Sequence, residues 1–204
     1  MEIYLVRHGQ TDGNLQRRHQ VEHSVLTKLG KEQAEEAGKE LKKFKPTHLV
    51  ASSLVRAIET ARIIGEECDL TPEISSHFIE IARPKEMYGR HHFSLSSLWF
   101  YFWWYFGSKH GTNNGGESYK QFRQRFTAAQ EYLAALPEDS RVVVVSHGVF
   151  ITFFTIHICN KKWMGPLRAL KVYADILSIK NGSITKVVYD TKAKKRECAW
   201  SVVK

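Results

Sequence analysis

Two apolar runs that lie far apart in this chain each end in a histidine followed by a glycine. The first run leads into His8 and Gly9, and the second, which contains the valines at 142–145, leads into His147 and Gly148. Continuous apolar runs of this kind are typical of strands buried on both faces of a parallel sheet. In open α/β sheets ligands bind at the carboxyl ends of the strands, so we expect the two histidines to share one crevice.

Strands and helices alternate in the first part of the chain. Residues 2–6 and 47–51 are predicted strands, and apolar side chains between them recur at helical spacing after Thr27, a predicted N-cap. A second helix should follow the second strand, with Arg56 in its first turn. Residues 74–81 could form another strand before the pattern breaks.

The later part of the chain continues this alternation. A capping box that begins at Ser118 predicts an amphipathic helix, which leads into the valine strand. The apolar residues 149–158 favour a buried helix, although β-branching leaves a strand open. Residues 176–179 and 184–189 predict a β-hairpin, because Asn181 and the glycine after it suit a type I′ turn.

These elements predict an α/β fold: a three-layer sandwich with a mostly parallel central sheet and helices on both faces. A chain of 204 residues is long enough for one domain with a substantial core. We expect a single domain over residues 1–204, with a small aromatic-rich cap insertion at about 82–116 and the hairpin near its C-terminal end.

The charge balance favours anionic partners. The chain has 30 Lys and Arg against 21 Asp and Glu, a formal net charge of +9, which suits phosphoesters, nucleic acids or acidic membrane surfaces. Part of the excess lies in runs at 39–43 and 192–196 that are typical of solvated surfaces. The hydrophobic fraction of 43% argues against a disordered or fibrous chain.

The cysteines and the start of the chain bear on the cellular compartment. Cys68, Cys159 and Cys198 are odd in number and widely spaced, so we predict neither a disulfide framework nor a zinc site. The chain enters a strand directly, so we expect no secretory signal, and no apolar run is long enough for a transmembrane segment. These patterns favour a reducing cytoplasm.

The turn after the first strand has the composition of an anion site. Arg7 can hold a phosphate with two parallel N–H bonds, and the glycine after His8 lets the backbone approach a ligand closely. Gln10 and Asn14 add side-chain donors. Taken alone, His8 fits a structural turn histidine better than a catalytic one. Arg56 strengthens the catalytic interpretation, because it brings a second guanidinium and a helix N-terminus to the same sheet edge.

Three ordered blocks of the sequence carry a resemblance to a known family. The blocks are Arg7-His8-Gly9-Gln10-Thr11 with Asn14, Ser53-Leu54-Val55-Arg56-Ala57, and Ser146-His147-Gly148. They resemble the histidine phosphatase superfamily, the phosphoglycerate mutase-like enzymes, and within it the small broad-specificity phosphatases. The likeness extends to Gly116-Glu117-Ser118 at the opening of the later helix, with Phe122 and Arg125.

The resemblance implies phosphoryl transfer through a phosphohistidine, with His8 as the nucleophile and Arg7, Arg56 and His147 around the phosphate. Two nearby guanidinium groups disfavour protonation of His8, so its nucleophilic neutral form would be present near neutral pH. The mechanism requires no cofactor and no metal ion. The expected phosphate-binding residues are Arg7, Gln10, Asn14, Arg56, His147 and Gly148.

Relatives of this type usually take the proton for the leaving group from a carboxylic acid after the second helix. Glu80, which has apolar neighbours, is our candidate for this general acid. Glu86 and Asp12 are weaker candidates, and each of the three is also compatible with an ordinary surface carboxylate.

The loop after the first block departs from the family pattern. Residues 22–25 read Glu-His-Ser-Val, where family members often carry an acidic residue and a proline. Arg17, Arg18 and His19 precede this loop and are either solvated or close to the pocket that it borders. The substrate preference of a relative therefore cannot be transferred to this chain.

Eight consecutive aromatic residues at 99–106 lie outside the matching blocks. The run is too short to span a bilayer. Its rings could line a pocket, form a homodimer interface or dock on a membrane surface, and they could equally pack a cap helix onto the domain. His91, His92 and His110 flank the run, but we predict no metal site.

We therefore predict a cytoplasmic phosphatase that hydrolyses a small phosphomonoester through a phosphohistidine at position 8. Phosphoglycerate mutase-type transfer is the nearest alternative, modestly disfavoured by the compact length. From a different class, a basic nucleic-acid or membrane-surface binding module would account for the charge and the aromatic run. The expected partner is a small phosphorylated substrate, with a homodimer as an option and no specific nucleic acid.

Overall fold

The computed structural model describes residues 1–105, 113–159, 172, 175–176, 179–193 and 198–203. Within these residues, strands form one six-stranded sheet in the order β3-β2-β4-β1-β5-β6. They are β1 Glu2–Arg7, β2 His48–Ser52, β3 Glu73–Ser75, β4 Arg141–Ser146, β5 Ile184–Tyr189 and β6 Trp200–Val203. Strands β1 to β4 are parallel and β5 is antiparallel to β1, which confirms the predicted α/β class and mostly parallel sheet.

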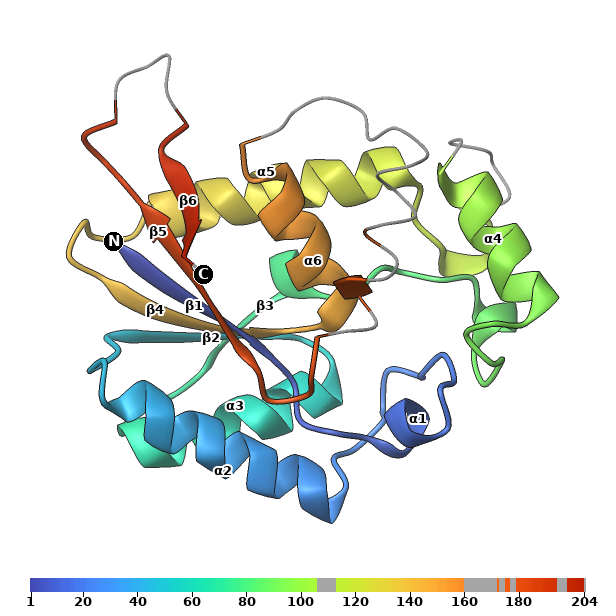
Figure 1. The fold of residues 1–204 in the computed structure, drawn as a ribbon, viewed down its shortest axis with the longest axis horizontal. Coiled ribbons are helices and arrows are strands. Elements are labelled where there is room, and N and C mark those ends of the chain that lie inside the picture. The colour runs from blue at the N-terminus through green and yellow to red at the C-terminus, as the bar shows by residue number, and fades with distance from the viewer. Residues whose placement is uncertain (106–112, 160–171, 173–174, 177–178, 194–197, 204) are drawn as a thin grey trace.

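Helices cover both faces of this sheet, with α2 and α3 on one side and α5 and α6 on the other (Figure 1). The helices are α1 Asp12–Leu15, α2 Lys28–Lys42, α3 Val55–Cys68, α4 Leu95–Tyr105, α5 Tyr119–Ala134 and α6 Gly148–His157. Short 3-10 turns are η1 Ser76–Phe78, η2 Lys85–Met87 and η4 Asn113–Gly115. The arrangement confirms the three-layer sandwich.

The two central strands are buried on both faces. In β1, Ile3 and Leu5 belong to the core beneath α5 and α6, whereas Tyr4 and Val6 belong to the core beneath α2 and α3. The valines of β4 at 142–145 divide between the two cores in the same alternating way. This double burial explains why both strands read as unbroken apolar runs.

Most helix boundaries agree with the sequence signals. Thr27 Oγ1 accepts a hydrogen bond of 3.0 Å from the Gly30 amide and caps α2. Ser118 and Gln121 form the capping box of α5, in which Gln121 Oε1 lies 2.7 Å from the Ser118 amide. The apolar residues 149–158 lie mainly in helix α6, so the alternative of a strand is excluded there.

The C-terminal hairpin differs from the prediction in its strands. Strand β5 covers residues 184–189 as expected, but its hairpin partner is β6. Ile176 is helical and Ile179 has no regular structure, while 177–178 lie outside the described residues. The turn is still present, with Gly182 at a φ of +75°. An Asn-Gly pair favours a tight turn whether or not a strand precedes it. The turn signal alone therefore could not identify the strand that pairs with β5.

The segment after α3 also contains less strand than expected. Of residues 74–81, only the start is extended, in the short strand β3, and the chain then turns through η1. Ser75 Oγ accepts a 3.4 Å hydrogen bond from the His77 amide and caps this turn. The apolar residues of the segment serve the core from a 3-10 turn and an irregular stretch rather than from a strand.

Cys159 and Cys198 form a disulfide, with their Cα atoms 5.6 Å apart, which corrects the expectation that the cysteines are unpaired. The two residues are 39 positions apart, yet the fold brings the end of α6 beside the start of β6. Spacing motifs detect only neighbouring pairs, so they could not reveal this contact. The disulfide removes the cysteine argument for a reducing compartment, and Cys68 remains a free thiol.

Between β3 and α5 the chain leaves the sheet and forms α4 at one end of the molecule (Figure 1). Among the described helices, none is long and apolar enough to cross a membrane. The limits of the cap insertion at about 82–116 stay a prediction, and Phe106 lies outside the described residues.

Candidate active site

His8 and His147 lie side by side at the carboxyl ends of β1 and β4. These strands are adjacent and parallel, and Arg7 stands opposite Ser146 in their register, so the next residue of each strand reaches the same point. The two imidazole rings have centroids 5.1 Å apart. The structure thus brings together two histidines that are far apart in the sequence, His8 and His147.

The hydrogen bonds of His8 define its tautomer. Nδ1 lies 2.7 Å from the Gly9 carbonyl oxygen, which can only accept, so Nδ1 carries the proton. Nε2 accepts a 3.2 Å hydrogen bond from Arg56 Nε, so Nε2 holds the lone pair. Burial holds the pKa of His8 well below its usual value, and Arg56 and Arg7 lower it further. His8 is therefore a neutral imidazole whose unprotonated Nε2 faces the Arg56 guanidinium.

His147 is fully buried beside His8 and is also neutral. Its Nε2 lies 2.7 Å from Ser52 Oγ at the end of β2. Burial, followed by the charge of Arg56, holds the pKa of His147 well below its usual value. Among the described residues its Nδ1 has no hydrogen-bond partner. Buried polar atoms are usually hydrogen-bonded, so this nitrogen is a candidate ligand contact.

Arg7 and Arg56 bring two guanidinium groups to the pocket that His8 lines. Burial lowers the pKa of Arg56 to about 10, which still leaves this guanidinium cationic at neutral pH. Burial also lowers the pKa of Arg7. Arg7 Nη1 donates to the carbonyl oxygen of Ile179. A Cβ on Gly148 would lie 3.3 Å from Arg7 Nε, so the glycine leaves this guanidinium room in the pocket.

The two predicted amide donors, Asn14 and Gln10, lie in different surroundings. Asn14 lines the pocket, and its Oδ1 accepts a 3.2 Å hydrogen bond from Asn181 Nδ2. The same Asn181 nitrogen lies 2.9 Å from the His8 carbonyl oxygen, a role that its turn motif did not indicate. Gln10, in contrast, is directed to α2, where its Oε1 lies 3.1 Å from Thr27 Oγ1. This arrangement does not support the phosphate-binding role predicted for Gln10.

Glu80 lines the same pocket and faces the N-terminus of α6. Its Oε1 lies 3.1 Å from the Phe150 amide and its Oε2 lies 3.3 Å from the Val149 amide, both of which donate to it. A carboxylate here complements the positive end of the helix dipole. The charge of Glu80 also partly offsets the effect of burial on the pKa values of Arg7 and Arg56, so it acts on both guanidinium groups.

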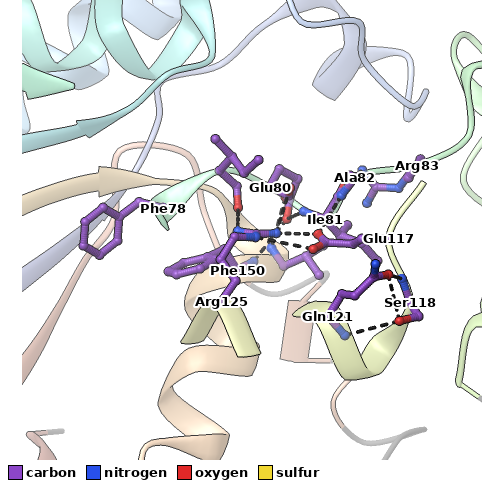
Figure 2. Close-up of polar contacts among 12 residues, drawn as sticks. Phe78, Glu80, Ile81, Ala82, Arg83, Glu117, Ser118, Gln121, Arg125 and Phe150 are labelled. Carbon is purple, nitrogen blue, oxygen red and sulfur yellow. Dashed lines mark hydrogen bonds and ion pairs between the residues drawn. The ribbon is translucent and has the colours of Figure 1, made fainter. Parts of the chain in front are cut away.

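A partly buried ion pair holds the segment that carries Glu80 (Figure 2). Arg125 of α5 pairs with Glu117 through Nη2 and donates to the carbonyl oxygens of Ile79 and of Glu80 itself, the latter at 3.3 Å. Glu117 Oε1 accepts a 2.9 Å hydrogen bond from the Ala82 amide. The pair therefore fixes the backbone on both sides of the candidate acid.

The described lining of the pocket is strongly basic, with five arginines, three histidines and Glu80 as its one carboxylate around about 340 Å³. The arginines are Arg7, Arg17, Arg18, Arg56 and Arg83. Such a lining suits an anionic ligand. Arg17 and Arg18, which the sequence left as either solvated or close to the pocket, are both exposed and part of its lining.

The outer wall of the pocket is attached to α4. His19 is 3% exposed, and its Nε2 lies 2.9 Å from Ser97 Oγ of α4. Burial lowers the pKa of His19 to about 2. Arg83, which no sequence motif indicated, donates from Nε to the Tyr101 hydroxyl at 3.1 Å. Helix α4, which contains most of the aromatic run, thus supports the pocket through the hydroxyl groups of Ser97 and Tyr101.

Comparison with known proteins agrees with this geometry. The profile of the histidine phosphatase superfamily (branch 1) matches residues 3–198. The chain belongs to the histidine phosphatase superfamily. It is 31% identical over 195 residues to a probable phosphoglycerate mutase GpmB of an Enterobacter species, covering 93% of this chain and 85% of that relative. A GpmB of Erwinia tasmaniensis is 35% identical over 158 residues, covering 73% and 70%.

Solved structures of this superfamily share the fold. The alpha-ribazole phosphatase of Shigella flexneri superposes with a TM-score of 0.75 at 22% identity, covering 94% of this chain and 92% of that one. A mycobacterial glucosyl-3-phosphoglycerate phosphatase gives a TM-score of 0.72 at 24% identity, covering 99% and 96%. At this level of identity the likeness establishes the architecture of a histidine phosphatase and not its substrate.

The weaker carboxylate candidates lie elsewhere in this histidine phosphatase fold. Glu86 is exposed and accepts a hydrogen bond from Asn114 Nδ2, and Asp12 is exposed in the first turn of α1. In the part of the chain that the structure describes, no three metal-binding side chains converge. His92 instead packs against His19 with the two rings tilted and their centroids 4.7 Å apart, and His110 lies outside that part.

Proposed function

We propose that this histidine phosphatase hydrolyses a small phosphomonoester through a phosphohistidine on His8. The observation that carries the proposal is the hydrogen bonding of His8, whose Nδ1–H is bonded to a carbonyl oxygen while Nε2 keeps its lone pair. Arg7 and Arg56 stand where they can bind the equatorial oxygens of a phosphate and stabilise their charge in the transition state.

In the first step His8 Nε2 attacks phosphorus opposite the ester oxygen. The Nε2–P bond forms, the P–O ester bond breaks, and the leaving oxygen takes a proton from the carboxyl group of Glu80. In the second step the Glu80 carboxylate accepts a proton from water as that water attacks phosphorus. The Nε2–P bond breaks, inorganic phosphate leaves and His8 is neutral again.

The remaining residues would position these groups. Asn14 and the buried Nδ1 of His147 are further candidate contacts for the phosphate oxygens. Glu80 must carry a proton when it donates to the leaving oxygen. The hydrogen bonds from the start of α6 hold its carboxyl group at the edge of the pocket.

Phosphoglycerate mutase-type transfer is the second candidate, favoured by the names of the GpmB relatives. It would use the same phospho-His8 but return the phosphate to another hydroxyl of the substrate instead of to water. Phosphatase neighbours in the structural comparison favour hydrolysis. Incubation with 3-phosphoglycerate separates the two, because a mutase forms 2-phosphoglycerate and a phosphatase releases inorganic phosphate.

The deciding experiment measures phosphate release from a panel of phosphomonoesters, in the presence of a chelator, by the wild type and by His8→Ala. We expect the wild type to turn over and His8→Ala to be inactive, with a mass increase on the His8 peptide of alkali-quenched wild type. Turnover that the chelator abolishes, or undiminished turnover by His8→Ala, would contradict the proposal.

A further inference from the structure

Helix α4 exposes a continuous apolar stripe. Leu95 is 87% exposed, Leu98 49%, Trp99 62% and Phe102 51%. Their spacing of three, four and seven residues places them on one side of the helix, which we call the α4 outer face. Single exposed apolar residues are common, but a contiguous patch of large side chains usually marks an interaction surface.

The opposite face of α4 is anchored in the core. Phe100 and Trp104 are buried, and the Trp104 ring lies 5.1 Å from that of Tyr119 and 5.8 Å from that of Phe122, centroid to centroid. The helix therefore cannot rotate to bury its outer face without exposing these rings. Figure 1 shows α4 at one end of the molecule, away from the central sheet.

Exposed cations border this face. Arg90 donates from Nη1 to Ser96 Oγ in the first turn of α4, at 3.1 Å. Arg90 Nε also donates to the Glu86 carbonyl oxygen at 2.7 Å, and Lys85 is exposed in the same turn, η2. Glu86 is the neighbouring acid. The apolar stripe thus has a basic margin, in a chain with a net charge of +9.

We infer that the α4 outer face docks on the surface of an anionic lipid bilayer. Tryptophan, phenylalanine and leucine side chains enter the boundary between headgroups and acyl chains, while arginine and lysine at the margin bind lipid phosphates. A second copy of the chain fits this surface less well. A two-fold contact would pair this face with an identical face, whose helix contains no acidic residue, whereas an anionic bilayer supplies the charge opposite to the basic margin.

Docking through α4 would also orient the pocket. The inner side of the same helix holds His19 through Ser97 and Arg83 through Tyr101, and both residues line the pocket. The wall of the pocket would therefore be joined to the docked helix. The docking itself does not depend on the proposed reaction, because it uses side chains outside the phosphate site.

The test is flotation of the intact protein with unilamellar vesicles of phosphatidylcholine that contain roughly 30% phosphatidylglycerol, at low ionic strength. We expect the wild type to float with these vesicles, to float less with pure phosphatidylcholine, and to be released by high salt. Trp99→Glu and Leu95→Glu should bind at least about tenfold more weakly, because each replaces an inserting apolar group with a charge.

The matched control is Leu29→Glu, which changes a similarly exposed leucine, 48% accessible, on the far helix α2 and should float as the wild type does. Circular dichroism of each variant verifies folding. Wild-type protein that stays at the bottom of the gradient would overturn the inference, as would equal loss of binding in Leu29→Glu. A vesicle-free dimer that Trp99→Glu dissociates, without any flotation, would assign the face to a second copy instead.

Discussion

At the scale of single residues, Arg56 has two contacts that bear on reactivity. Its Nε donates to His8 Nε2 at 3.2 Å and its Nη1 to the Val21 carbonyl oxygen at 3.3 Å. Lysine would keep the charge but lose the planar, multidentate donor. We expect Arg56→Lys to lower kcat/KM about 100-fold in steady-state phosphate release. Arg62→Lys, exposed on the same helix, is the control, and wild-type activity in Arg56→Lys would contradict the assignment.

His19 gives a second residue-scale prediction, for stability. Its pKa is about 2 in the folded protein and roughly 6.5 in an unfolded chain, so below pH 6.5 the unfolded state binds the extra proton. The free energy of unfolding must then fall as pH decreases, by about 1.4 kcal/mol per unit from this group. The free energy of unfolding, measured with urea at pH values between 6 and 5, should change less steeply with pH in His19→Asn than in the wild type. The control Val21→Ala, at an exposed position, should keep the wild-type pH dependence of stability. An unaltered pH dependence in His19→Asn would refute the low pKa of His19.

At the scale of elements, short sequence signals correctly predicted the helix caps and the central strand that depend only on neighbouring residues. The caps at Thr27 and Ser118 and the valine run at 142–145 are each readable from a few neighbouring residues, and the structure contains all of them. The strand predicted at 176–179 relied on a turn signal alone, and it is wrong in the residues described there. Periodicity also could not show that α4 holds His19, since that contact joins segments far apart in sequence.

The ion pair between α5 and the Glu80 segment gives the element-scale prediction. Arg125→Gln removes the donor that holds the Ile79 and Glu80 carbonyl oxygens, so the acid should lose its position. We expect kcat for an alkyl phosphate to fall about tenfold, and that for p-nitrophenyl phosphate to change little, since p-nitrophenolate leaves without a proton. Glu80→Gln should show the same selectivity more strongly.

The control for the ion pair is Lys120→Met, an exposed change on the same helix. A merely structural role for Arg125 would reduce turnover of both substrates alike, because less folded enzyme would be present. Equal loss on the alkyl and p-nitrophenyl esters, together with a lower thermal midpoint, would therefore reject a positioning role for Arg125.

At the scale of the whole molecule, the site assembles from segments that only the complete fold brings together. The grouping of His8, Arg56 and His147 was predictable because each follows or begins an element whose end lies at the same sheet edge. The outer wall of the pocket was not predictable, because Arg83 and His92 come from irregular segments between β3 and α4. Nothing in their local sequence indicates where such segments lie.

The disulfide joins two distant parts of the fold. Cys159 follows helix α6, Cys198 precedes β6, and the bond therefore connects this helix to the edge strand of the sheet. Its loss removes a constraint on the unfolded chain, so we expect Cys198→Ser to lower the free energy of unfolding by about 2–4 kcal/mol. Urea denaturation measures this, with Cys68→Ser as the control that leaves the pair intact. If dithiothreitol fails to destabilise the wild type and mass spectrometry finds three free thiols, the link does not form in solution, and the cysteines again favour a reducing compartment.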